Sequence, residues 1–147
     1  MIAREVDFPP VWLAGFAAIG ALAGRIYPLS YPHLPVLGAA MVGFALALMA
    51  AAAAQMLWAR TTILPRQIPA RLVTGGVFRF SRNPIYLADA LLLVGLYFFW
   101  QALIALPLVA LFMHLIYRRF IRGEEAAMLH AFGAEFEDYR RRTRRWL

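Results

Sequence analysis

The chain of 147 residues contains no cysteine and no lysine, and only 16% of its residues are charged. Without cysteine it can form neither a disulfide nor a thiolate nucleophile, and it offers no cysteine ligand to a metal. His33 and His130 have no third partner at the spacing of metal ligands, so we predict no metal site. Soluble domains carry about 25% charged residues. The scarcity of charge therefore excludes an ordinary water-soluble globule.

Hydrophobic residues take the place of the missing charge. They make up 63% of the chain, and the mean hydropathy is +0.64. Residues 34–59 and residues 90–117 contain no charged side chain at all. A helix of about 20 residues crosses the roughly 30 Å hydrocarbon core of a bilayer. The sequence therefore predicts an all-α integral membrane protein.

We predict one membrane domain over residues 1–147, with the polar segments 59–83 and 122–147 outside the bilayer. A turn at Trp100-Gln101 divides the long apolar stretch 84–117 into two short spans, and Pro107 lies early in the returning helix. Four transmembrane helices result, over about residues 9–24, 35–58, 84–100 and 102–121.

The first apolar run could instead be a signal peptide, because Ala21-Leu22-Ala23 fits the small-residue cleavage rule. Glu5 and Asp7 outweigh Arg4 in the leader, however, whereas a signal peptide needs net positive charge. We therefore favour a retained first helix.

The basic residues indicate the orientation. All fifteen are arginine, against eight acids, which gives a net charge of +7. In a soluble chain this excess would indicate nucleic acid, but here the arginines flank apolar runs, so we predict contact with lipid headgroups and no nucleic-acid partner. Arginines gather in segments 60–83 and 118–147, which places both segments and both termini in the cytoplasm. The Arg- and Ala-rich usage resembles that of bacteria and favours the bacterial inner membrane.

The two polar segments also carry the recognisable motifs. Residues 72–86 read LVTGGVFRFSRNPIY, and the tail contains RGEEAAML at 122–129 and FGAEFEDY at 132–139. A hairpin of the third and fourth spans would bring these segments together. In order and spacing, residues 60–146 resemble the isoprenylcysteine carboxyl methyltransferase and phospholipid methyltransferase superfamily of membrane enzymes. Asp89 and Phe136 depart from its pattern, which usually has a small or apolar residue and a tyrosine there.

The resemblance implies S-adenosylmethionine as cofactor, held by the cytoplasmic loop and an amphipathic helical tail, and a lipophilic acceptor that enters from the bilayer. It implies that Arg82 and Glu125 are catalytic. Arginine suits the carboxylate of the cofactor, a glutamate can accept from its ribose diol, and aromatic rings suit its adenine or its sulfonium. No GxGxxG motif after a strand is present, which excludes a soluble Rossmann methyltransferase. The cofactor-binding residues expected are Arg82, Asn83, Tyr86, Glu124, Glu125, Phe132, Tyr139 and Arg142.

The function implied is S-adenosylmethionine-dependent methyl transfer to an acceptor similar to an isoprenylcysteine carboxylate, at the cytoplasmic membrane face. A carboxylate is already ionised at pH 7, whereas an amine needs a base such as Glu125 or Asp89 to remove its proton. The alternatives are a phosphatidylethanolamine N-methyltransferase, a non-catalytic membrane scaffold with the same fold, and a relative that binds NADPH, as membrane sterol reductases do.

Several of these residues also have structural explanations. Asn83 precedes a proline and is a good helix N-cap. Glu125 can pair with Arg122 one turn away on a helix. Arg82 and Asp89 are seven residues apart on one helical face and could form an ion pair.

Overall fold

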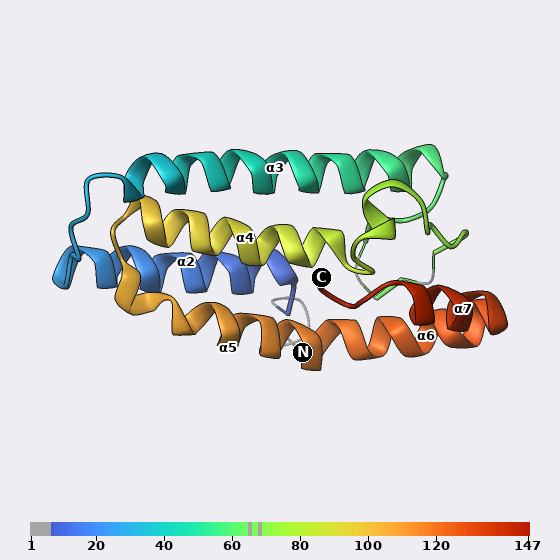
Figure 1. The fold of residues 1–147 in the computed structure, drawn as a ribbon. Helices are drawn as coiled ribbons and strands as arrows, with labels where there is room; N and C mark the ends of the chain where they lie inside the picture. Colours follow the sequence, from blue (N-terminus) through green and yellow to red (C-terminus); the bar gives the residue numbers. More distant parts are fainter. Residues whose placement is uncertain (1–6, 65, 68) are drawn as a thin grey trace.

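Each of the four long apolar helices has a proline in its first turn, where a missing backbone N–H costs no hydrogen bond. The computed structural model describes residues 7–64, 66–67 and 69–147, and every regular element within them is helical. The helices lie side by side (Figure 1). They are α2 (Pro9–Ile26), α3 (Leu34–Trp58), α4 (Pro84–Phe99) and α5 (Pro107–Ile116), with short 3-10 turns η1 (Gly76–Arg79) and η2 (Leu103–Ala105).

The tail continues the last long helix without a break. A π-helical turn, η3 (Tyr117–Ile121), joins α5 to α6 (Arg122–Phe132), and Gly133, with φ +51°, turns the chain into α7 (Ala134–Arg142). Such π-turns insert an extra residue into a helix and are frequent near functional sites. The predicted turn at Trp100-Gln101 is confirmed, because α4 ends at Phe99 and Gln101 has φ +56°.

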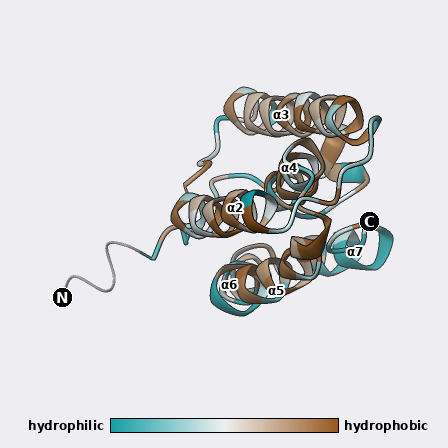
Figure 2. Cartoon of the chain, turned by 90° about the vertical axis from the view of Figure 1, so that its left-hand side faces the viewer, coloured by the Kyte–Doolittle hydropathy of each residue, from teal (hydrophilic) through white to brown (hydrophobic). Residues whose placement is uncertain are grey.

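α4 is the central helix of the bundle. It contacts α3 on one side and both α2 and α5 on the other, as the end-on view also shows (Figure 2). Leu93 and Tyr97 of α4 are completely buried, and the Tyr97 hydroxyl donates a hydrogen bond to the backbone oxygen of Phe16 in α2. The core therefore lies around α4, while the outer helices turn apolar side chains outward.

In the described part of the chain, three helices are long and apolar enough to cross a membrane. They are Pro9–Ile26, Leu34–Trp58 and the continuous helix Leu103–Phe132. α4 is apolar but has only 16 residues, about 24 Å at 1.5 Å per residue. The last span, predicted to end at residue 121, is continuous with eleven further helical residues.

Glycine allows the helices to approach closely. A Cβ at Gly38 of α3 would lie 2.4 Å from the backbone nitrogen of Phe99, and one at Gly95 of α4 would lie 3.0 Å from the backbone oxygen of Gly38. Such contacts leave no room for a side chain, so these two glycines set the separation of α3 and α4.

We expect Gly38→Ala to destabilise the protein by about 1–3 kcal/mol, the cost of overpacking a tight interface. Gly43→Ala is the matched control, because a Cβ at Gly43 of the same helix has no described atom within 4 Å. The apparent Tm in detergent measures both. An unchanged or higher Tm for Gly38→Ala would contradict the close approach of the two helices.

Candidate functional site

A cavity of about 300 Å³ lies at the end of the bundle where α3 ends and α2 and α4 begin. Ligand pockets usually start at about this size. Most of its wall is apolar and comes from α2, α3, α4, α6 and the loop after α3. Its polar lining residues are Thr62, Gln67, Arg82, Asn83, Tyr86, Asp89 and Glu124.

Arg82 contributes a nearly buried guanidinium to this cavity. Its side chain is 9% exposed, and its Nη1 lies 3.3 Å from Oε1 of Glu125. That contact lacks hydrogen-bond geometry, and both Nε and Nη1 of Arg82 have no hydrogen-bond partner in the part of the chain that is described. Burial lowers the pKa of Arg82, while Glu125 acts in the opposite direction. The guanidinium stays charged at neutral pH and has two buried donors to offer.

Glu125 stands behind Arg82 and does not line the cavity. Its two oxygens accept hydrogen bonds from Nε and Nη2 of Arg145, at 3.0 and 2.9 Å. This bidentate bond is the main reason that the pKa of Arg145 is raised. Glu125 thus joins α6 both to the start of α4 and to the C-terminal segment, and it does not pair with Arg122 as local spacing allowed.

The segment after α7 returns to the start of α4. The backbone N–H of Arg82 donates to the carbonyl of Arg144, and the carbonyl of Arg145 accepts from the side chains of Ser81 and Asn83. Asn83 occupies the N-cap position of α4, but its side chain makes no capping bond. The expected N-cap role of its side chain is therefore wrong, because the amide binds the returning C-terminal segment instead.

Tyr86 and Glu124 form a second polar contact in the cavity wall. The Tyr86 hydroxyl donates to Oε1 of Glu124 at 2.8 Å, and the backbone N–H of Arg66 donates to the same oxygen at 3.3 Å. The guanidinium of Arg66 also lies over the ring of Phe120, 4.7 Å from its centroid. The loop after α3 is thereby attached to α6 across the cavity.

Asp89 is one turn beyond Tyr86 on α4 and also lines the cavity. It is only 6% exposed, yet its carboxylate forms no ion pair with another described residue. The ion pair with Arg82 that its spacing allowed is absent, because Arg82 turns to Glu125. Asp89 is therefore a buried acid without a counter-ion among the residues described.

Besides Glu125, three predicted site residues lie outside the cavity wall. Tyr139 is 3% exposed and donates to the carbonyl of Phe78 at 2.6 Å, and burial raises the pKa of its hydroxyl. Phe132 packs against a small apolar cluster that contains Tyr139 and Phe78. Arg142 is exposed, and its Nε donates to the carbonyl of Asp138. These residues support or flank the wall behind Arg82.

No sequence motif indicated that part of the cavity wall comes from α2 and α3. This part comes from Phe8, Pro9 and Pro10 at the start of α2 and from Met49 and Met56 of α3. These residues are apolar, as are the lipid-facing residues around them, so composition could not distinguish them.

The fold and the cavity define a helical membrane protein with a charged cavity at one end of its bundle. Residues 34–135 match the family model described as phospholipid methyltransferase. Because this match covers more than half of the chain, the chain belongs to the phospholipid methyltransferase family. Neither a curated protein nor a solved structure matches it. Family membership makes it a membrane methyltransferase that acts on lipid-like substrates.

The matched region contains five polar residues of the cavity wall. Arg82 and Asn83 lie just before α4, Tyr86 and Asp89 lie on α4, and Glu124 lies on α6. The region ends before Tyr139 and does not include α2. The polar part of the cavity is therefore within the family region, while the start of α2 adds an apolar wall from outside it.

We expect Glu125→Gln to destabilise the protein by about 3 kcal/mol, because it removes the carboxylate that two partly buried guanidiniums share. Glu137→Gln is the control, since its pair with Arg140 is exposed on the surface of α7 and should change stability by no more than about 0.5 kcal/mol. Unfolding by SDS titration in mixed micelles measures both. Equal stabilities of the two variants would show that Glu125 does not hold this end of the bundle together.

Proposed function

We propose that the chain transfers a methyl group from S-adenosylmethionine to the amine of a lipid-like acceptor in the cavity at the end of the bundle. The observation that carries this proposal is that one cavity contains both a buried guanidinium with unpartnered donors and, separately, a buried carboxyl group. Arg82 has two unsatisfied donors, and Asp89 has no counter-ion among the described residues. The first suits an anionic group of the cofactor, and the second suits a cationic acceptor.

The residues present fit this cofactor. Its carboxylate would be attracted to the charged guanidinium of Arg82, which lines the cavity and whose Nε has no hydrogen-bond partner among the described residues. Orphaned buried donors are costly, so a bound carboxylate would relieve a penalty that the protein alone carries. Tyr86 and Glu124 supply a ring and an acceptor oxygen nearby in the wall. The cofactor, when bound, supplies an electrophilic methyl group on a sulfonium.

The charges of the wall favour an amine over a carboxylate. Asp89 and Glu124 are acids, whereas Arg82 is the only basic residue among the described lining residues. An isoprenylcysteine carboxylate, the acceptor expected first from the sequence, would lie beside two acids and would gain no attraction from them. An ammonium headgroup such as that of phosphatidylethanolamine would be attracted to them. We therefore place the phospholipid N-methyltransferase ahead of the carboxyl methyltransferase.

Asp89 is the residue suited to prepare the amine. An ammonium must lose a proton before its nitrogen has a lone pair for the incoming methyl group. Glu124 already accepts from Tyr86 and from the backbone of Arg66, whereas the side chain of Asp89 accepts no hydrogen bond from a described residue. Its carboxylate would hold the ammonium and accept the proton, while the methionines and prolines of the wall limit the access of water.

In the membrane, we propose that α4 is a fourth, short span. It lies between three helices that are long enough to cross, so its neighbours and not lipid cover most of its surface. The cavity end would face the cytoplasm, because the arginines of the loop and of the tail collect there. The inner membrane of a bacterium fits this arrangement.

We expect Asp89→Asn to reduce methylation of phosphatidylethanolamine in vesicles at least 100-fold, within the range that a general base contributes. Its affinity for S-adenosylhomocysteine should change by less than twofold, because Arg82 is untouched. The assay follows transfer of a labelled methyl group into the lipid fraction. The apparent Tm should stay the same or rise, because the variant replaces a buried acid that has no counter-ion among the described residues.

Asp138→Asn, a substitution on the exposed face of α7, serves as control and should retain full activity. If a prenylated cysteine carboxylate is methylated while phosphatidylethanolamine is not, the amine proposal is wrong and the protein is a carboxyl methyltransferase. If Asp89→Asn retains activity on the amine, Asp89 is not the base.

A further inference from the structure

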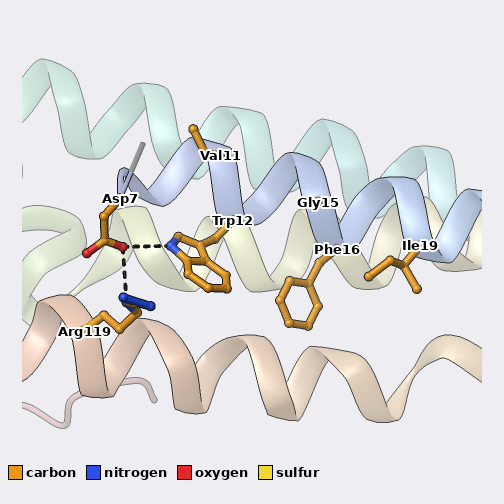
Figure 3. Close-up of a pocket in the computed structure, with 7 residues that line it drawn as sticks. All are labelled: Asp7, Val11, Trp12, Gly15, Phe16, Ile19 and Arg119. Carbon is orange, nitrogen blue, oxygen red and sulfur yellow. Dashed lines mark hydrogen bonds and ion pairs between the residues drawn. The ribbon is translucent and has the colours of Figure 1, made fainter. Parts of the chain in front are cut away.

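A second hollow of about 380 Å³ lies on the outside of the bundle, between α2 and the helix formed by α5 and η3. It shares no lining residue with the cavity of the proposed methyl transfer. Figure 3 shows its residues: five come from α2, Asp7 lies two residues before that helix, and the seventh is Arg119 of η3. We call this hollow the α2 groove.

The length of the α2 groove matches one leaflet of a bilayer. Its lining within α2 extends from Val11 to Ile19, eight residue steps or about 12 Å along the helix. Asp7, two residues before the helix begins, extends it further. Half of a hydrocarbon core is about 15 Å. The ring of Phe16 packs edge-on against Phe112 of α5 and is almost buried, whereas Gly15 leaves open space beside it. The groove is thus an apolar channel of suitable length for an acyl chain.

The groove is polar at one end only. There Asp7 accepts a hydrogen bond from Nε1 of Trp12 at 3.0 Å and pairs with Nε of Arg119 at 3.2 Å (Figure 3). Arg66 pairs with the same carboxylate, and the Arg119 guanidinium lies 4.9 Å from the centroid of the Trp12 ring. Among the described residues, the Asp7 carboxylate is shared between Arg119 and Arg66.

The two arginines and Trp12 also set the charge state of Asp7. Burial raises the pKa of Asp7, but the hydrogen bond from Trp12 and the two arginines outweigh it, so that the pKa lies below its ordinary value. Asp7 is therefore ionised at neutral pH. The side chain of Arg119 is 44% exposed, so part of its guanidinium remains available to an outside anion.

We propose that the α2 groove binds one phospholipid, with an acyl chain along Gly15 and Phe16 and its phosphate at Arg119. The apolar groove supplies the site for the chain, and the partly exposed guanidinium of Arg119 at its rim supplies the site for a phosphate. Trp12 lies between the two, where an amphipathic ring is favoured at a membrane interface. This lipid is separate from the methyl acceptor, because its site and the cavity have no lining residue in common.

Gly15→Leu tests the site of the chain. A Cβ at Gly15 meets no described atom within 4 Å, so a leucine fills the groove without a clash in the protein. Gly43→Leu is the matched control, an exposed glycine of α3 with equally open space. The probe is dioleoylphosphatidylglycerol, which has no amine to methylate, titrated into detergent-solubilised protein and followed by native mass spectrometry. We expect Gly15→Leu to weaken its binding at least tenfold and Gly43→Leu to leave it within twofold of the unmodified chain.

Arg119→Gln tests the site of the phosphate, with the neighbouring exposed Arg118→Gln as control. The first should weaken phosphatidylglycerol binding at least tenfold and the second should not. Diolein, which has the same chains without phosphate, should bind at least tenfold more weakly than phosphatidylglycerol. Equal lipid retention by Gly15→Leu and Gly43→Leu, equal effects of the two arginine variants, or equal binding of diolein would each overturn the proposal.

Discussion

The contact of Glu125 with Arg82 and Arg145 holds together three parts of the chain that are distant in sequence. It joins α6 to the start of α4 and to the segment that follows α7. Two guanidiniums and one carboxylate in a half-buried place are stable only while all three are present. The cavity depends on this arrangement, because Arg82 lines it and Glu125 supports Arg82 from behind. The bidentate bond of Glu125 goes to Arg145, which leaves Nε and Nη1 of Arg82 without a hydrogen-bond partner among the described residues.

The apolar helices form the scaffold, and the polar loop and tail supply most of the charged residues of the cavity end. The long helices pack around α4 with glycine at the closest contacts, and this rigid bundle fixes the position of Tyr86 and Asp89. The loop after α3 and the tail add the charged residues at one end. A methyltransferase for lipids needs this combination, since its acceptor is apolar over most of its length and polar only at the reacting headgroup. The α2 groove on the outer surface has a similar arrangement, with an apolar wall and the charged residues Asp7 and Arg119 at one end.

Much of the fold follows from local chemistry. Pro84 and Pro107 mark helix starts, and Trp100-Gln101 marks the turn between them, because proline and a break in hydropathy act locally. The π-turn that continues α5 into α6 could not be predicted, since charged residues at 118 and 119 indicate the end of a span. Glu125 was expected at the site, but its partner Arg145 lies 20 residues away, and sequence spacing indicates only near neighbours. The walls contributed by α2 and α3 were hidden, because an apolar residue that faces a cavity resembles one that faces lipid.

The central claim is that the guanidinium of Arg82 binds the carboxylate of the cofactor. Calorimetric titration of S-adenosylhomocysteine into the detergent-solubilised protein tests it most directly, with Arg82→Ala beside Arg142→Ala. Arg142 is an exposed arginine outside the cavity wall, so its variant controls for general loss of positive charge. The account predicts micromolar binding that weakens at least tenfold, about 1.4 kcal/mol, in Arg82→Ala and stays unchanged in Arg142→Ala. The absence of binding to the folded protein, or equal affinity of the two variants, would contradict it.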